Sequence, residues 1–505
     1  MKNYASSRAQ RGRVAYRTSS RFIYSQVQKR KINDIKTNCL ANRFYKKAQI
    51  KKMKLNFFGG AGMVTGANYM LEVGSIKFLV ECGMIQGEQH TDQLNAADFP
   101  YNPEEIDFVL ITHAHLDHIG RLPKLIRNGF SGKIYATAPT KDLMPFILED
   151  AYKIASEEAK HYPKRIHFDM DDVNKVSEYS ESVPYNKEFS PAENVKVTFR
   201  DAGHILGSAI IEVQLEENGK TVKIVFSGDL GNSPTLLLNP ITMIKEADYV
   251  LVESAYGDRV HEDKKNRQHL LEDVIESTVT DGGVLLIPSF ALERTQELLY
   301  EINKLVENKR IPPTPVYIDG PLSLHATDVY KKHQSYFNKE TTAVIQSGDD
   351  IFQFQGLKLA RTPEESKAIN DIKPPKIIIA GSGMSQGGRI LHHELRYLPD
   401  PRNTILFITY QVRGTRGRKI MEGMPSVHIF GQEVPVKLQV KTLAGYSAHA
   451  DQVGLLKWID NFQRPVKKVF VVQGEQNASE ALKNLIQDKL GIPAEVSTLG
   501  EAIEL

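Results

Sequence analysis

A run of metal-ligand side chains directly after a buried strand constrains the fold of this chain more than any other feature. The apolar stretch IDFVLI is followed at residues 112–120 by THAHLDHIG. Residues i and i+2 of an extended segment point to the same side, so His113 and His115 can share one metal ion. The chain then turns into a helix, which carries Asp117 and His118 toward a neighbouring position. Four ligand-type residues within six positions are hard to explain as packing, and they predict a metal site.

Two later segments supply further candidate ligands at the ends of strands. His204 lies in DAGHILGSA after the strand-like VKVTFR, and Asp229 lies in FSGDLGN after VKIVF. A Gly-His or Gly-Asp pair at a strand end is often only a turn. Together with the cluster, however, these residues give a set of imidazoles and carboxylates that suits two zinc ions, with Asp229 able to bridge them.

The chain alternates short apolar strands with amphipathic helices from Met53 onward, which indicates an α/β fold. The segment 217–220 carries the Asn-Gly signal of a tight hairpin between two strands. From about Tyr256 a second α/β block begins, in which buried strands end in glycine and lead into helices. That pattern is typical of a doubly wound sheet. From about residue 426 the sequence returns to strands.

Composition excludes several classes of protein. The 505 residues include only two cysteines, which rules out a disulfide framework and a cysteine-ligated zinc cluster. No run of about 18 apolar residues occurs, so we expect no membrane-spanning helix. The net charge of +3 divides into +14 for residues 1–52 and −11 for the remainder. A body with that charge cannot hold a polyanion by bulk attraction, so contact with one would need a local basic groove.

Residues 1–52 form a basic segment with 15 Lys and Arg, one acid (Asp34) and no clear apolar period. This composition fits an organelle transit peptide, or a disordered basic arm that contacts RNA or an anionic surface. It also fits an upstream extension of a protein that starts at Met53, which opens directly into a strand. We expect the segment to pack little against the rest of the chain.

On these motifs, the chain resembles the metallo-β-lactamase superfamily, and in particular its β-CASP branch of nucleic-acid-processing nucleases, over residues 53–505. The resemblance implies an αββα sandwich that begins at 53–257, an inserted doubly wound β-CASP domain at 258–425 and a return to the sandwich at 426–505. Three further segments are β-CASP-like: GDRVH (257–261), PSFALERTQELL (288–299) and GSGMSQGGRI (381–390).

The resemblance also implies roles for individual residues. Glu253 in VESAYG matches the acid of motif A, and His449 in GYSAHAD matches the histidine of motif B. His449 would act as the general acid that protonates the leaving oxygen, while Glu253 hydrogen-bonds within the site and Asp117 helps to orient the attacking water. The zinc ligands of the family match six residues: His113, His115, Asp117, His118, His204 and Asp229.

Two positions depart from the family pattern. Glu81 stands where the family has an Asp that orients the histidine cluster, so the charge is kept on a longer side chain. Gln473 stands where the family has the motif C histidine, a ligand of the second zinc, and no histidine follows His449. A neutral amide oxygen is a poor zinc ligand beside imidazole. We therefore expect the second site to bind zinc weakly or to prefer a harder ion such as Mn²⁺.

Candidate RNA contacts lie in the second block. The glycine-rich GSGMSQGG, with Ser382 and Gly383, follows a strand and precedes a helix, where backbone N–H groups can hold a phosphate. A plain packing turn explains this loop equally well. Charge runs are usually solvated, but a local basic groove is needed. Its candidate residues are Arg294, Arg389, Arg413, Arg416, Arg418 and Lys419.

We therefore expect a zinc-dependent ribonuclease that hydrolyses single-stranded RNA in RNA processing or decay. The resemblance implies products with a 5′-phosphate and a 3′-hydroxyl. Cleavage is expected to be endonucleolytic, with a 5′-exonucleolytic mode left open. A compact bacterial form in the cytoplasm, away from membranes, fits the chain, and a homodimer is left open. Two rival functions remain: a non-catalytic RNA-binding paralogue, which Gln473 favours, and a small-molecule metallohydrolase, against which the β-CASP insertion argues.

Overall fold

The computed structural model describes residues 53–87, 91–159, 168–261 and 266–505. Residues 1–52 are not among these, so the expectation for the basic segment lies outside the described residues. In the part of the chain that is described, no helix is both long and apolar enough to cross a lipid bilayer.

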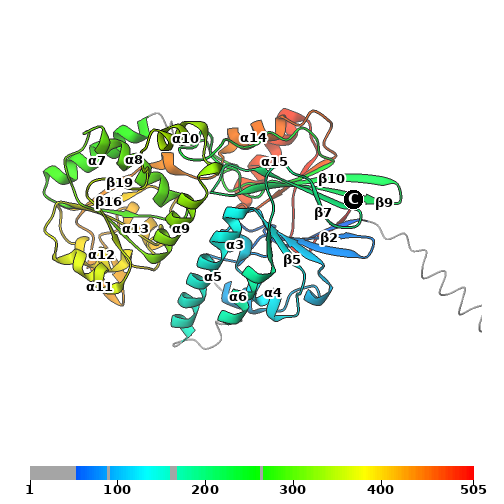
Figure 1. The fold of residues 1–505 in the computed structure, drawn as a ribbon, viewed down its shortest axis with the longest axis horizontal. Coiled ribbons are helices and arrows are strands. Elements are labelled where there is room, and N and C mark those ends of the chain that lie inside the picture. The colour runs from blue at the N-terminus through cyan, green and yellow to red at the C-terminus, as the bar shows by residue number, and fades with distance from the viewer. Residues whose placement is uncertain (1–52, 88–90, 160–167, 262–265) are drawn as a thin grey trace, which may run out of the picture. The chain divides into compact units, whose positions relative to one another are not determined.

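Two seven-stranded sheets pack face to face in the first domain (Figure 1). The first sheet has the order β22-β1-β2-β3-β4-β5-β6, and the second has the order β21-β20-β11-β10-β9-β8-β7. Phe57 and Phe78 of the first sheet meet Phe226 and Phe470 of the second in the apolar layer between them. The strands of the first sheet are β1 (Lys54–Gly59), β2 (Asn68–Val73), β3 (Ile76–Val80), β4 (Phe108–Leu110), β5 (Lys133–Ala136), β6 (Ser180–Ser182) and β22 (Ala502–Glu504). Those of the second are β7 (Phe189–Ala192), β8 (Val195–Asp201), β9 (Ala209–Glu217), β10 (Lys220–Phe226), β11 (Tyr249–Glu253), β20 (Lys468–Val472) and β21 (Ala494–Val496).

The hairpin between β9 and β10 confirms the Asn-Gly prediction. Glu217 pairs with Lys220, and the two residues between them, Asn218 and Gly219, have φ angles of 53° and 76°. Positive φ at both central positions is what the tight turn requires, and an Asn-Gly pair favours it. The resulting register directs alternate side chains, such as Val213, into the layer between the sheets.

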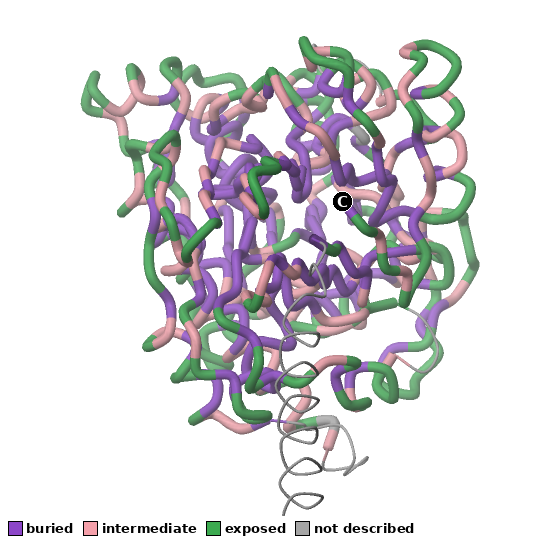
Figure 2. The backbone as a smooth tube through the Cα atoms, turned by 90° about the vertical axis from the view of Figure 1, so that its right-hand side faces the viewer, coloured by how far each residue is buried: buried purple, intermediate pink, exposed green. Residues whose placement is uncertain are grey.

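Helices cover the outer face of each sheet and complete four layers. Leu125 and Leu148 pack on the outside of the first sheet, while Trp458 and Leu482 pack on the outside of the second. Figure 2 shows the buried backbone running through the interior of this body, with exposed segments around it. The predicted αββα sandwich is therefore confirmed. The helices of this domain are α2 (Thr91–Ala96), η1 (Pro103–Glu105), α3 (Leu116–Ile119), α4 (Leu122–Arg127), α5 (Ala138–Ala159), α6 (Met170–Tyr179), η6 (Ala444–Tyr446), α14 (Gln452–Asp460) and α15 (Gln476–Leu490).

The inserted domain is built on a six-stranded sheet with the order β14-β13-β15-β12-β16-β19, in which every pair is parallel. Leu298 and Val329 pack on one face and Ile390 and Ile420 on the other, so the sheet is doubly wound, as predicted. Its strands are β12 (Val284–Pro288), β13 (Val316–Asp319), β14 (Leu357–Ala360), β15 (Lys376–Ala380), β16 (Thr404–Phe407) and β19 (Gln439–Thr442). Its helices are α7 (Arg267–Thr280), α8 (Arg294–Glu307), α9 (Pro321–Lys332), η4 (Gln334–Tyr336), α10 (Lys339–Gln346), α11 (Pro363–Ala368), η5 (Ile369–Asp371), α12 (Ile390–Tyr397) and α13 (Arg416–Met421).

The return to the sandwich differs from the expected boundary at residue 426. The hairpin of β17 (Ser426–Ile429) and β18 (Gln432–Pro435) packs Val427 and Val434 into the core of the inserted domain, and β19 pairs with β16 of the inserted sheet. The sandwich therefore resumes after Thr442. The sequence pattern predicted the strands correctly, but it does not tell to which sheet a strand belongs.

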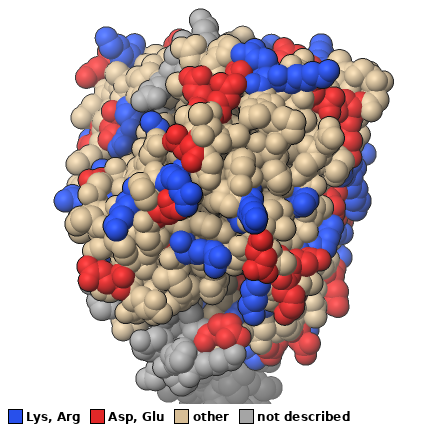
Figure 3. Space-filling view, turned by 90° about the vertical axis from the view of Figure 1, so that its left-hand side faces the viewer, with Lys and Arg blue, Asp and Glu red and all other residues tan. Residues whose placement is uncertain are grey.

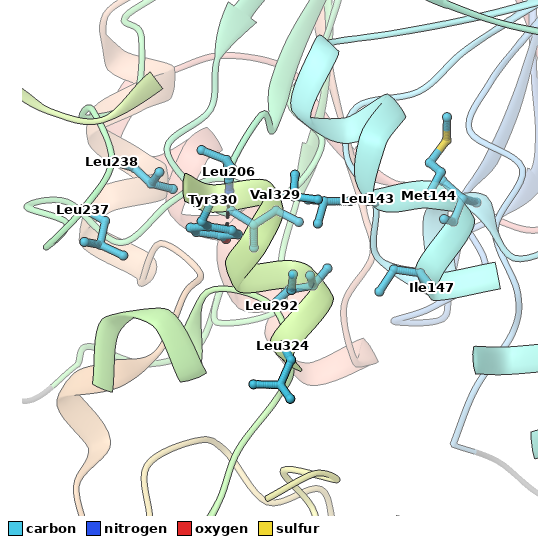
Figure 4. Close-up of a cluster of buried hydrophobic side chains, with 14 of the residues drawn as sticks. Leu143, Met144, Ile147, Leu206, Leu237, Leu238, Leu292, Leu324, Val329 and Tyr330 are labelled. Carbon is cyan, nitrogen blue, oxygen red and sulfur yellow. Dashed lines mark hydrogen bonds between the residues drawn. The ribbon is translucent and has the colours of Figure 1, made fainter. Parts of the chain in front are cut away.

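A continuous apolar cluster joins the two domains (Figure 4). Leu143 and Ile147 of α5 in the sandwich face Val329 of α9 in the inserted domain, and Leu206 lies beside Tyr330. The Tyr330 hydroxyl accepts the Leu206 N–H at 3.2 Å. Because Leu206 belongs to the β8–β9 loop, this interface reaches the loop that also carries His204.

Candidate metal centre

The candidate ligands lie where strands of both sheets end, at one edge of the sandwich. His113 follows β4, His204 lies between β8 and β9, and Asp229 follows β10. Gly228 has a φ of 54°, and a Cβ at this position would lie 2.8 Å from Cβ of Thr112. Glycine therefore allows the Asp229 loop to approach the His113 loop so closely.

Four ligand atoms from these loops converge on one point. Nε2 of His113 lies 3.0 Å from Nδ1 of His115 and 3.4 Å from Oδ2 of Asp229. Nε2 of His204 lies 3.3 Å from Nδ1 of His115 and 3.5 Å from Oδ2 of Asp229. A tetrahedron whose corners lie about 2.0–2.1 Å from its centre has edges of about 3.3–3.4 Å. The four residues therefore fit a tetrahedral zinc ion.

The protonation of these groups also suits a metal cation. Burial first, and neighbouring imidazoles second, hold the pKa of His115 and His204 well below the usual value, so both rings keep a free lone pair. Burial alone would raise the pKa of Asp229, but His118 and His113 outweigh it and hold that pKa well below its usual range. The first site thus offers neutral imidazoles and an ionised carboxylate.

Glu81 lies beneath the histidine cluster. Its Oε1 accepts the Thr112 N–H at 3.0 Å and lies 3.6 Å from Nδ1 of His118. The Thr112 hydroxyl in turn lies 2.9 Å from Nδ1 of His113. The longer side chain therefore still reaches both the loop of the first site and the ring of His118, and the added methylene is accommodated.

The second set of expected ligands converges less closely. Nε2 of His118 lies 3.3 Å from Oδ1 of Asp229 and 3.7 Å from Oδ2 of Asp117. The first set brings all its ligand atoms within 4.8 Å of one another; among the described residues, this second set does not. The side-chain nitrogen of Gln473 lies 3.1 Å from Nε2 of His118 and donates to Oδ1 of Asp229 at 3.3 Å. With an amide N–H₂ group between them, these residues do not fit a second ion.

His449 and Glu253 form a polar pair beside the first site. Nδ1 of His449 lies 3.1 Å from Oε2 of Glu253 and 4.0 Å from Oδ2 of Asp229. Glu253 also accepts the Leu230 N–H at 2.6 Å, which fixes its carboxylate. Burial lowers the pKa of His449, but Glu253 and Asp229 outweigh this and raise it to about 9. A partly exposed imidazolium therefore lies beside the ligands at neutral pH.

Two neighbours of His449 were not singled out from the sequence. A ring nitrogen of His261 lies 3.0 Å from the His449 carbonyl oxygen, and the Tyr256 ring centroid lies 6.0 Å from that of His449. Both come from the segment SAYGDRVH, which follows β11 directly. His261 ends the β-CASP-like segment GDRVH, but its place beside His449 was not predicted, and the signal for Tyr256 was an aromatic residue three positions after Glu253.

The arginines expected to contact RNA have different surroundings. Arg389 forms an ion pair of 2.6 Å with the buried Asp319, and only 18% of its side chain is exposed. Arg416 donates to two main-chain carbonyl groups, and Arg294 is buried in an ion pair with Glu297. These three stabilise the inserted domain. Arg418 pairs with Glu422 at 2.7 Å, whereas Arg413 and Lys419 are exposed.

The glycine-rich loop between β15 and α12 is partly closed on itself. The Ser382 hydroxyl oxygen accepts the N–H of Gln386 at 3.0 Å and that of Gly387 at 3.2 Å. A Cβ on Gly383 would lie 2.9 Å from the ring of Phe290, so this residue packs directly beneath an aromatic side chain. Two of the N–H groups in this loop are therefore already bonded, which favours the packing turn.

The sequence matches three families in succession. Residues 70–254 match the metallo-beta-lactamase superfamily domain, residues 295–420 match the Beta-Casp domain, and residues 433–497 match the Zn-dependent metallo-hydrolase RNA specificity domain. The first two matches fall on the sandwich and on the inserted domain.

Curated relatives are similar over most of the chain. Ribonuclease TTHA0252 of Thermus thermophilus is 38% identical over 89% of this chain and 100% of its own length. The RNase J-like protein of Methanocaldococcus jannaschii is 32% identical over 89% of this chain and 99% of its own. Transcription termination factor FttA of Methanosarcina mazei is 30% identical over 90% of this chain and 72% of its own.

A solved structure shares the fold. The crystal structure of a protein of unknown function from Enterococcus faecalis V583 aligns with a TM-score of 0.54, covering 90% of this chain and all of that one, at 12% identity. This likeness shows the fold alone. The full-length similarity to the Thermus protein and the three consecutive family matches show more: the chain belongs to the β-CASP branch of the metallo-β-lactamase superfamily.

Proposed function

We propose that this chain is a zinc-dependent ribonuclease that cuts single-stranded RNA internally. The convergence of His113, His115, His204 and Asp229 on one tetrahedral point carries the proposal. A bound zinc ion supplies a Lewis acid and lowers the pKa of a water molecule, which suits phosphodiester hydrolysis. The named relatives include a ribonuclease and an RNase J-like protein, which supports RNA as the substrate.

His449 is proposed as the general acid of this reaction. Glu253 accepts a hydrogen bond from Nδ1 of His449, which leaves the other ring nitrogen to donate a proton to the leaving oxygen. With a pKa of about 9, the ring holds that proton at neutral pH. The side chain is 28% exposed, so a bound substrate can reach it. Asp117, whose carboxylate is also partly exposed, is proposed to orient the attacking water.

RNA binding is proposed to depend on local contacts. The face formed by the inserted domain carries Lys and Arg interspersed with Asp and Glu (Figure 3), so it offers no broad basic surface. Arg413 is the proposed phosphate contact, because its side chain is exposed and, among the described residues, forms no ion pair or hydrogen bond such as those of Arg389 and Arg416. The match to an RNA specificity domain at 433–497 supports RNA rather than DNA.

Location and assembly belong to the same proposal. With two cysteines in 505 residues, the chain suits a reducing compartment, which supports action in the cytoplasm. A homodimer stays a prediction, and the molecular mass in solution, measured by light scattering, tests it.

The test uses the full chain and a 5′-labelled single-stranded RNA, with DNA of the same sequence and the RNA duplex as alternative substrates. Chelation should abolish cleavage, and Zn²⁺ or Mn²⁺ added back should restore it and show which ion is preferred. Internal fragments indicate endonucleolytic cleavage, whereas released mononucleotides indicate the 5′-exonucleolytic mode. His204→Ala should remove both metal and activity, and His428→Ala, at an exposed site on β17, serves as the matched control.

Two outcomes would contradict the proposal. RNA that is bound but never cut, at any metal concentration, would favour the non-catalytic RNA-binding paralogue. Turnover of small ester substrates without RNA cleavage would favour the small-molecule metallohydrolase.

A further inference from the structure

The side chain of Gln473 lies between His118 and Asp229, and its main chain and side chain are both held in place. Its main-chain N–H donates to the carbonyl oxygen of Gly60 at 2.7 Å, and its side chain is buried. A Cβ on Gly60 would lie 3.2 Å from Cγ of Gln473, so the stem of the side chain is packed against the backbone. The amide group therefore has a fixed position.

The partners at the two ends of the amide select one orientation. The Tyr69 hydroxyl donates to Oε1 of Gln473 at 3.5 Å, while Nε2 of Gln473 donates to Oδ1 of Asp229 at 3.3 Å. Turning the amide over would set its oxygen against the carboxylate of Asp229. Two acceptors would then face each other in a buried place, which is unfavourable. The nitrogen end therefore faces Asp229. The same end can face His118 when Nε2 of that ring is the acceptor and Nδ1, 3.6 Å from Glu81, carries the hydrogen.

An amide nitrogen in this orientation excludes a cation. The N–H₂ group is a donor and offers no lone pair to a metal. It lies 3.1 Å from Nε2 of His118 and 3.3 Å from Oδ1 of Asp229, the two atoms that a second ion would need as ligands. The partial positive charge of the N–H₂ group thus faces the carboxylate of Asp229 where a second metal ion would lie.

We propose that the chain holds one resident metal ion, at His113, His115, His204 and Asp229, and that the amide of Gln473 replaces a second ion. Asp229 is then shared, with Oδ2 facing the first site and Oδ1 held by Gln473. Gln473 is a positioning residue that fixes this carboxylate for the first ion. The inference rests on the proposed function only in treating the first site as a metal site, and it does not depend on RNA cleavage.

Metal stoichiometry tests the proposal. The full chain is stripped with a chelator and dialysed against Zn²⁺, and bound zinc is counted by mass spectrometry. The wild type should hold one equivalent, and Gln473→His should hold two, because an imidazole lone pair replaces the N–H₂ group. Two tightly bound equivalents in the wild type would overturn the proposal, whatever the cleavage assay shows. No bound zinc would overturn both this proposal and the metal-dependent function.

The positioning role has a separate readout. Gln473→Met keeps the size of the side chain but cannot hold Asp229, so zinc affinity at the first site, measured by competition with a chromophoric chelator, should fall about 10–100-fold. Gln296→Met, at a fully buried glutamine in the inserted domain, is the matched control and should leave that affinity unchanged. An unchanged affinity in Gln473→Met would refute the positioning role. If circular dichroism shows that Gln473→His does not fold, the zinc stoichiometry of the wild type and the zinc affinity of Gln473→Met still test the proposal.

Discussion

Replacing Tyr330 with phenylalanine removes one hydroxyl group from the interface between the two domains. The Tyr330 side chain is fully buried, and its hydroxyl accepts the Leu206 N–H at 3.2 Å and donates to a carboxyl oxygen of Glu293 at 2.5 Å. Burial first, and Glu297 second, raise the pKa of Glu293 to about 8, so this carboxyl group is largely neutral at pH 7. Both hydrogen bonds therefore join neutral groups.

The expected cost follows from what the substitution leaves behind. The phenyl ring keeps its contacts with Phe337 and Phe352, so no cavity larger than a hydroxyl group forms. A buried polar group that loses its partner costs about 1–3 kcal/mol, and two groups lose one here. We expect Tyr330→Phe to lower the free energy of unfolding by about 2–6 kcal/mol.

Urea denaturation measures this change with two signals. The fluorescence of Trp458, the single tryptophan, reports on the sandwich, and far-UV circular dichroism reports on both domains. Tyr152→Phe is the matched control, because Tyr152 is only partly buried and its hydroxyl has no hydrogen-bond partner among the described residues; its change should stay within about 0.5 kcal/mol. If the urea midpoint of Tyr330→Phe equals that of the wild type, the hydroxyl does not connect the domains as described.

Other substitutions test the remaining parts of the structure. Burial raises the pKa of Glu394 to about 8, above its unfolded value of about 4.3, so stability should fall as pH rises between these values. Glu394→Gln should make that slope less steep in urea midpoints measured from pH 5 to 8, with the remainder due to groups such as Glu293 whose pKa is also raised. A slope as steep as that of the wild type would contradict the assignment. His449→Ala should slow RNA cleavage about 10²–10⁴-fold at unchanged zinc content, whereas loss of zinc would make it a ligand instead. Leu324→Ala in the interface cluster should lower the free energy of unfolding in urea by about 2–5 kcal/mol. The control Leu270→Ala, at a side chain that is 45% exposed, should lower it by less than about 0.5 kcal/mol. Equal changes in the two variants would refute the cluster as a core.

The convergence of the candidate metal ligands could be predicted from the sequence because they lie in short segments with a fixed local geometry. His113 and His115 are two positions apart after a strand, and the glycine before Asp229 marks a close turn. The orientation of Gln473 could not be predicted in the same way. It depends on Tyr69, which is 404 residues away in the sequence. The sequence predicts a poor oxygen ligand there, whereas the structure shows the nitrogen facing the site.

The protein partners of Arg389 and Arg416 could not be predicted for a related reason. A run of basic residues shows where charge is available, but not which acids and carbonyl groups the fold brings beside it. Asp319 is 70 residues from Arg389 and reaches it only because β13 and β15 are neighbours in the inserted sheet. The domain boundary differs from the expected one for the same reason. The pairing of β19 with β16 depends on the whole sheet, and neither strand's sequence indicates it.

The strand order of the sandwich has a consequence for the synthesis of the chain. β20 lies between β11 and β21 in the second sheet, and β22 pairs with β1 at the edge of the first. Residues 53–254 therefore leave the ribosome with two strand edges uncovered, and such edges favour aggregation. All strands of the inserted sheet lie within 284–442, so that domain can fold while its host still lacks the strands β20, β21 and β22 and the helices α14 and α15. The metal centre receives its last neighbour, Gln473, only when synthesis of the chain is nearly complete.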